Sequence, residues 1–169
     1  MNRSGLAAAC ALLVVSCTEQ PTDVVASIGR PADHLVPGLP GVGLLRCDAL
    51  PRDSVSVTIG PSGGVIVVGP HALTVPEGAL TASVTITAVA PSDSVRRVTF
   101  APDGLAFAQA VELRMSYAGC DGAGSWLPKG IVQVADDLAI LDVLASLDLR
   151  SLFTTSASLR HFSGYAVAW

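Results

Sequence analysis

Apolar and polar residues alternate one by one in short runs from Cys47 to the end of the chain. In the first run, Val55, Val57 and Ile59 alternate with serine and threonine, and residues 111–117 repeat the pattern. Successive side chains of a strand point to opposite faces, so such a run buries one face and exposes the other. Glycine, proline, aspartate and serine separate the runs, at intervals of roughly 8–12 residues, which is typical of a sandwich. We therefore predict an all-β domain, an antiparallel β-sandwich.

Further runs predict the remaining strands of this domain. They lie at residues 65–68, 73–75, 84–88, 95–100, 152–160 and 165–169. Residues 131–134 and 138–141 flank turn-forming aspartates and predict a hairpin. Leucine and alanine in the following segment also fit helical spacing, so residues 142–151 are compatible with a short helix. The part of the chain after residue 118 is interpreted as a C-terminal β extension.

The N-terminus has the pattern of a removable leader. Arg3 precedes an apolar run at residues 6–15, which is too short for a membrane span of about 20 residues but suits a signal peptide. The leader ends in Val-Val-Ser-Cys, which resembles the lipobox of bacterial lipoproteins. That resemblance implies cleavage after Ser16 and attachment of lipid to the sulfur of Cys17. The alternative is an ordinary secretory signal, in which this cysteine has no special role.

The lipobox resemblance has consequences for location and partners. Each buried CH₂ of an acyl chain contributes about 0.8 kcal/mol, so two or three chains hold a protein firmly at a membrane. We expect an extracytoplasmic protein whose first partner is the membrane itself. Thr18, rather than aspartate, follows Cys17, which favours the outer membrane in a cell that has two.

The sequence divides into three predicted segments. Residues 1–16 form the signal peptide. Residues 17–46 lack periodicity and are rich in proline and glycine, which predicts a flexible tether. Residues 47–169 form the β-sandwich domain.

The four cysteines separate into two groups. Cys10 is removed with the leader and Cys17 takes the lipid, which leaves Cys47 and Cys120 in a compartment that permits disulfides. We predict that these two are bonded, which stabilises the fold by roughly 4 kcal/mol in the chain-entropy model. The alternative is a pair of separate buried thiols.

Composition excludes several classes of function. The formal net charge is −4 and becomes more negative when Arg3 is removed, which argues against nucleic-acid binding. Arg96 and Arg97 form the single adjacent basic pair and are interpreted as a solvated strand end. The three histidines lack ligand spacing, so no metal and no cofactor is predicted. The Gly-Pro-Ser-Gly-Gly run at residues 60–64 is predicted to be a turn between two strands rather than a strand-to-helix nucleophile elbow. Asp136 and Asp137 are adjacent and would point to opposite faces of a strand, so they do not form a pair of catalytic acids and are interpreted as turn formers. An enzyme is therefore a poor hypothesis.

Several segments resemble the ZU-five domain, which zonula occludens proteins, Unc-five netrin receptors and ankyrins share. The most specific is Val-Pro-Glu-Gly-Ala-Leu at residues 75–80, preceded by Gly63-Gly64 and followed by Phe-Ala-Pro-Asp-Gly-Leu-Ala-Phe at residues 100–107. The resemblance covers about residues 54–118 and is strongest to bacterial lipoproteins that carry one such domain. It implies a β-sandwich that serves as an interaction or structural module.

One motif suggests covalent chemistry. Some ZU-five modules cleave themselves between phenylalanine and serine in a motif like His161-Phe162-Ser163. That likeness implies that Ser163 attacks the preceding carbonyl while His161 takes the hydroxyl proton. The alternative is that His161 and Ser163 are polar residues at a strand edge and Phe162 fills the core.

Together these features predict a non-enzymatic, lipid-anchored β-sandwich of the bacterial cell envelope, which binds an unidentified envelope protein or surface ligand. The first alternative is a self-cleaving module cut between Phe162 and Ser163. The second is a small outer-membrane β-barrel, since alternating strands and the terminal Trp169 also fit that class.

Overall fold

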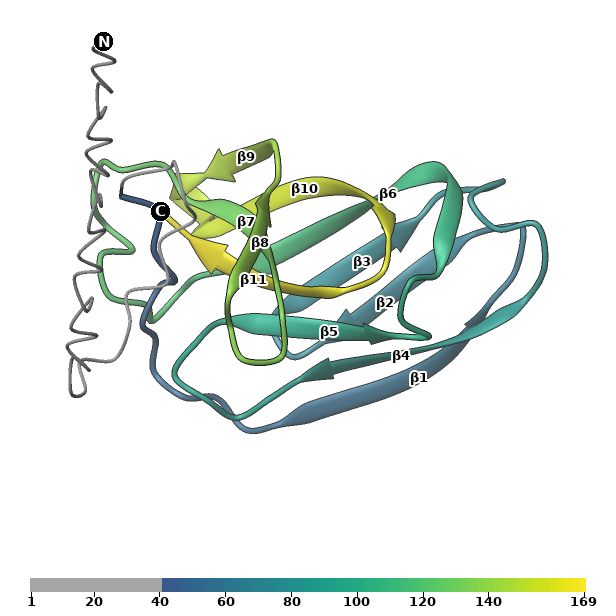
Figure 1. Cartoon of the computed structure of the whole chain (residues 1–169), viewed down its shortest axis with the longest axis horizontal. Coiled ribbons are helices and arrows are strands. Elements are labelled where there is room, and N and C mark those ends of the chain that lie inside the picture. Colours follow the sequence, from purple (N-terminus) through teal and green to yellow (C-terminus); the bar gives the residue numbers. More distant parts are fainter. Residues whose placement is uncertain (1–40) are drawn as a thin grey trace, which may run out of the picture. The chain divides into compact units, whose positions relative to one another are not determined.

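The computed structural model describes residues 41–169, which fold into strands and one 3₁₀ turn (Figure 1). The elements, in chain order, are β1 (Asp53–Ile59), β2 (Gly64–Val68), β3 (His71–Val75), β4 (Val84–Ala90), β5 (Arg97–Ala101), β6 (Ala106–Ser116), β7 (Gly130–Val134), β8 (Ile140–Val143), β9 (Ser146–Leu149), η1 (Arg150–Leu152), β10 (Thr154–His161) and β11 (Gly164–Ala168).

The strands form two antiparallel sheets that pack as a sandwich. One sheet has the order β1-β4-β5-β11-β7-β8 and the other has the order β2-β3-β6-β10-β9. The prediction of an all-β antiparallel sandwich is confirmed. Both sheets are open, since each ends in two edge strands, and the fold is therefore not a closed barrel. The barrel alternative is wrong for this chain.

The alternating runs explain which side chains face outward. On the outer face of β1 and β4, Ser56 pairs with Thr87 and Thr58 pairs with Thr85, with hydroxyl oxygens 2.7 and 2.9 Å apart. These hydroxyls hydrogen-bond to one another across the two strands, while Val57 and Ile59 turn toward the core. Cross-strand pairs of this kind stabilise an antiparallel sheet and fix its register.

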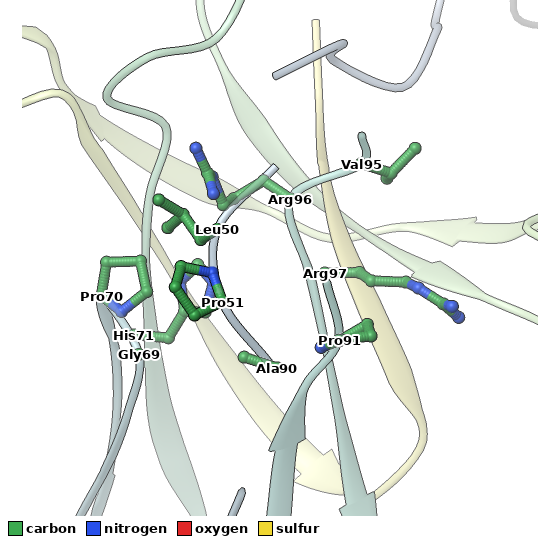
Figure 2. Close-up of a pocket in the computed structure, with 10 residues that line it drawn as sticks. All are labelled: Leu50, Pro51, Gly69, Pro70, His71, Ala90, Pro91, Val95, Arg96 and Arg97. Atoms are coloured by element: carbon green, nitrogen blue, oxygen red, sulfur yellow. The ribbon is translucent and has the colours of Figure 1, made fainter. Parts of the chain in front are cut away.

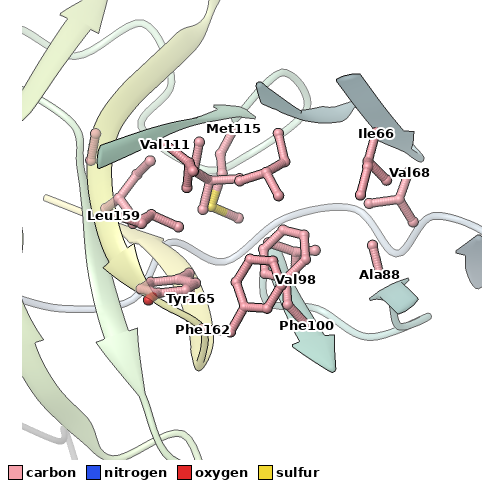
Figure 3. Packing of buried hydrophobic residues seen from close by; sticks show 14 of the residues in the cluster. Ile66, Val68, Ala88, Val98, Phe100, Val111, Met115, Leu159, Phe162 and Tyr165 are labelled. Carbon is pink, nitrogen blue, oxygen red and sulfur yellow. The ribbon is translucent and has the colours of Figure 1, made fainter. Parts of the chain in front are cut away.

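The core lies between the two sheets and takes apolar residues from both (Figure 3). Phe162 stacks on Phe100 with ring centroids 4.8 Å apart and meets Phe107 edge-on at 4.9 Å. Val111 and Met115 from β6 belong to the same cluster. Aromatic pairs in these geometries contribute about 0.5–1.5 kcal/mol beyond the area that they bury.

The folded domain begins earlier than the predicted boundary at Cys47. Leu45 is fully buried, and its N–H donates to the carbonyl of Val167 at 3.0 Å. Leu44 and Val42 pack on a second apolar cluster, which β7, β8 and β11 form on the outer face of their sheet. Residues 42–46 therefore belong to the sandwich rather than to the tether. The sequence of residues 42–46 shows neither alternation nor the length of a typical strand, because this segment only extends an existing sheet by a few residues.

The segment that was compatible with a short helix forms a strand and a tight turn. β9 pairs with β10 at the edge of the five-stranded sheet, and η1 follows it over three residues. Leu147 and Leu152 are exposed, so the leucine spacing does not mark a buried helical face.

We name the two ends of the sandwich for their distance from residue 41. The proximal end holds residues 41–52, the β6–β7 loop, η1 and Trp169. The distal end holds the turns between β1 and β2, β3 and β4, β5 and β6, and β10 and β11. Figure 1 shows the C-terminus at the end where the described chain begins.

Candidate functional site

The predicted lipidation site, Cys17, lies outside the described residues, as does most of the predicted tether. The predicted disulfide is present. Cys47 and Cys120 are bonded and face each other as an isolated antiparallel bridge. Asp48 and Gly119 continue this pairing through a backbone hydrogen bond of 2.9 Å. The bond ties the start of the domain to the β6–β7 loop at the proximal end.

The His161-Phe162-Ser163 motif forms the turn between β10 and β11 at the distal end. The side chain of Phe162 is buried in the core, as the alternative interpretation of the motif expects. Its backbone is also fixed, because its N–H donates to Leu105 O at 2.9 Å and its carbonyl accepts from Gly104 N–H at 3.2 Å. The bond that would be cut is thus held between the core and the β5–β6 turn.

The two polar side chains of the motif have different hydrogen-bond partners. His161 Nδ1 lies 3.3 Å from the Phe162 carbonyl oxygen and donates to it when that nitrogen carries the proton. Ser163 Oγ accepts a hydrogen bond from Gln133 Nε2 at 3.1 Å. The structure therefore places His161 beside the carbonyl that would be attacked, rather than in the predicted position as base for the serine hydroxyl.

A neighbouring tyrosine holds the histidine backbone in place. The Tyr165 hydroxyl donates to His161 O at 2.6 Å. Burial raises the pKa of Tyr165 to about 12, with a smaller contribution from the negative charge of Asp103. This hydroxyl stays protonated at neutral pH and acts as a donor, so it does not serve as a base.

A cavity of about 440 Å³ opens at the proximal end (Figure 2). Its walls are mainly apolar, with Leu50, Pro51 and Pro70 beside two buried polar side chains, His71 and Arg96. These dimensions suit a small ligand with an apolar body.

The buried histidine of this cavity is neutral. Its Nδ1 accepts the N–H of Ser116 at 3.3 Å. Burial, together with the positive charge of Arg96, lowers the pKa of His71 from 6.5 to about 4. A group with that pKa carries no charge at neutral pH.

Arg96 is buried although the sequence predicted a solvated strand end. Its Nη2 donates to Ala118 O at 3.0 Å, and its Nε has no hydrogen-bond partner among residues 41–169. Burial lowers the pKa of Arg96, and the charges of Asp48 and Asp93 oppose that shift. Its neighbour Arg97 is partly exposed and pairs with Asp93 at 2.7 Å.

The alternation could have located both buried polar residues. His71 shares the inward face of β3 with Leu73 and Val75. Arg96 comes two residues before Val98 and so falls on the inward face of that run. The prediction of a solvated pair treated the two arginines alike, although adjacent residues of an extended chain point to opposite sides.

Other sequence candidates do not gather into a site. Asp136 and Asp137 lie in the β7–β8 turn, where Asp137 accepts the N–H of Ala139 at 3.0 Å. In the described part of the chain, no three His, Cys, Asp or Glu side chains are arranged to hold a metal ion. Within the same residues, no helix has both the length and the apolar composition to cross a membrane.

No protein-family model matches the chain, and no curated protein matches it either.

Proposed function

We propose that the protein is a lipid-anchored, extracytoplasmic β-sandwich of ZU-five type that serves as a binding or structural module of the bacterial cell envelope. The observation that carries this proposal is the Cys47–Cys120 disulfide. Stable disulfides are a property of oxidising compartments, where the lipobox-like leader would deliver the chain.

The position of the disulfide also suits a tethered module. Any pull on the anchor enters the sandwich through residues 42–46, which are held to β11 by a few backbone hydrogen bonds. The covalent bond at Cys47 comes directly after them and joins the chain to the β6–β7 loop. A load that peels away residues 42–46, Leu45 included, is therefore stopped at Cys47 before it reaches β1.

The anchor is tested on the protein made in a bacterial host with its own leader. Intact mass of the membrane fraction is expected to show a chain that begins at Cys17 and carries acyl chains. Cys17→Ala is expected to move the protein into the soluble fraction, while Cys10→Ala leaves it on the membrane. A mature chain without lipid, found soluble in the wild type, would contradict the anchor.

The binding role is tested separately by crosslinking the anchored protein in intact envelopes. An envelope component captured by the wild type, and lost when the domain is replaced by an unrelated soluble domain on the same leader, supports a binding module. Capture that depends on the leader alone contradicts it.

Self-cleavage is a second candidate, because the Phe162 carbonyl has two polar contacts. The Gly104 N–H and His161 Nδ1 lie 3.2 and 3.3 Å from this oxygen, where they can stabilise the negative charge that develops during attack. In the reaction, Ser163 Oγ bonds to the Phe162 carbonyl carbon, the peptide C–N bond breaks and the nitrogen takes the proton that the serine hydroxyl loses. Water then hydrolyses the resulting ester, leaving a carboxylate on Phe162 and a free amine on Ser163.

Intact mass under denaturing conditions tests this candidate. Cleavage would yield a peptide of residues 163–169 from the wild type, and Ser163→Ala would abolish it. A single uncut chain after prolonged incubation would refute self-cleavage without affecting the proposed anchor.

A further inference from the structure

The described chain begins beside its own C-terminus. Gly43 N–H donates to Trp169 O at 3.4 Å, and Trp169 N–H donates back to Gly43 O at 3.2 Å. The indole ring of Trp169 lies against Gly43, 3.3 Å from the place where a Cβ atom would stand. Whatever precedes residue 41 therefore joins the sandwich next to a tryptophan.

The same end of the sandwich exposes large apolar side chains. Trp126 in the β6–β7 loop is 78% exposed, Leu152 in η1 is 66% exposed and Trp169 is 40% exposed. Leu127 and Phe153 are also exposed there. The chain has two tryptophans, and both belong to this group. Tryptophan is enriched where proteins meet the membrane–water interface, because its ring is apolar and its N–H is polar.

The loop that presents Trp126 is held in shape from inside. The Lys129 Nζ atom is buried and donates to Ser125 Oγ at 2.8 Å and to Leu127 O at 2.6 Å. Asp148 accepts the Lys129 N–H at 3.0 Å and the Tyr117 hydroxyl at 2.6 Å, which ties both ends of the loop to β9. These hydrogen bonds hold the loop in one conformation, so Trp126 is exposed at a fixed position on the surface.

Connections between elements bring the exposed residues to one end. Tyr117 N–H donates to Phe153 O at 2.8 Å, so η1 lies against the start of the β6–β7 loop. Gly130, which follows that loop, pairs with Ala168, next to Trp169. Figure 1 shows the C-terminus at the same end as the β6–β7 loop.

Charge separates the two ends of the sandwich. The distal turns carry Glu77 and Asp103, and the exposed Arg160 lies near the end of β10 beside them. The β7–β8 turn adds Asp136 and Asp137 without a basic residue. The proximal end carries arginines, including Arg46, Arg52 and Arg150, that balance its aspartates. The proximal end therefore presents less net negative charge to an anionic bilayer than the distal and β7–β8 turns together do.

We propose that the proximal end is a membrane-docking face, on which Trp126, Trp169, Leu152 and Phe153 enter the interfacial layer of the bilayer that holds the lipid anchor. This inference rests on the proposed lipidation of Cys17. The sequence has 23 residues between Cys17 and residue 41, and a flexible linker of that length would have an r.m.s. reach of about 26 Å. Such a tether keeps the face near the bilayer at an effective concentration of order millimolar, so weak insertion is enough for docking.

Tryptophan fluorescence tests this docking, because both tryptophans lie on the proposed face. Full-length lipidated protein is reconstituted into anionic phospholipid vesicles, with and without bromine on the acyl chains. Docking predicts a blue-shifted emission that brominated lipid quenches. Trp126→Phe leaves the signal of Trp169 alone, which is expected to be quenched as well.

A pair of variants separates insertion from simple tethering. Leu152→Ser with Phe153→Ser is expected to reduce quenching, whereas Val65→Ser with Val67→Ser, at exposed positions of edge strand β2, leaves it unchanged. Mass spectrometry of the same sample reports whether Cys17 carries lipid. Lipidated protein whose tryptophans are not quenched overturns the docking face and leaves the anchor intact. Absence of lipid overturns the anchor, and the docking face with it.

Discussion

At the scale of single residues, the proximal end places a neutral histidine beside a buried arginine. His71 and Arg96 are both nearly inaccessible to solvent. Protonating His71 would create a second positive charge in a poorly solvated region and would remove the acceptor of the Ser116 N–H. Both effects oppose protonation in the folded state and are absent in the unfolded chain, so the pH dependence of folding reports on this pair.

We predict that His71 makes the domain less stable as the pH falls from about 6.5 to about 4. The folded pKa is about 4 and the ordinary value is 6.5, so within this interval the unfolded chain binds a proton that the folded chain does not. Stability therefore decreases with falling pH and levels off below the folded pKa, and the total loss is at most about 3.5 kcal/mol. Urea unfolding of the wild type and of His71→Gln across this range measures the effect. Equal pH dependence in the two proteins would contradict it.

The disulfide is a second determinant at this scale. Reduction of Cys47–Cys120 is expected to lower the free energy of unfolding by about 2–4 kcal/mol, because the unfolded chain gains the entropy of a long open loop. Denaturant melts with and without reductant measure the change. The double variant Cys47→Ser, Cys120→Ser should be insensitive to reductant and should match the reduced wild type. A reductant effect that persists in this variant would point to another cause.

At the scale of elements, the sequence predicted strands most accurately where one face of the strand is buried and the other is exposed. The runs around β1, β4 and β6 alternate over most of their length, because one side chain in two faces solvent. β9 is a short edge strand whose leucines are partly exposed, so its pattern did not separate strand from helix. The His161–Ser163 turn was identified from its amino-acid motif. Its hydrogen bonds, however, are made with Gly104 and Gln133, which are remote in sequence, so the motif alone did not predict them.

The β1–β2 turn depends on a glycine that the ZU-five resemblance also included. Gly63 has φ of +73°, and a Cβ atom there would overlap the backbone carbonyl oxygen of Val75. Gly104 has a similar φ of +70° but open space around the Cβ position. We predict that Gly63→Ala lowers the free energy of unfolding by more than about 2 kcal/mol. Gly104→Ala is expected to lower it by about 1 kcal/mol, from backbone conformation alone. Thermal unfolding of both variants measures the difference, and equal losses would show that the overlap relaxes freely.

At the scale of the whole molecule, the sandwich has two unlike ends. The proximal end combines the disulfide, the incoming chain, both tryptophans and a cavity, while the distal end presents acidic turns and the His161–Ser163 turn. A module that is anchored through Cys17 and docked by its proximal end, as proposed, would display the distal end away from the membrane. Partner binding and any self-cleavage would then occur at the distal end, on the side that faces other molecules.

The incoming chain is itself part of the folded unit, which gives a prediction about where the domain can be cut. A protein that begins at residue 47 keeps the disulfide but loses Leu45, which is fully buried, and uncovers part of the apolar cluster around Ala166 and Ala168. We expect it to be less stable than a protein that begins at residue 41 by at least about 1.5–3 kcal/mol, the contribution of one buried leucine. Urea unfolding of the two truncated proteins measures the difference. Leu45→Ala in the longer protein should reproduce much of the loss. Equal stability of both truncated proteins would place the domain boundary at Cys47 after all and would return residues 42–46 to the tether.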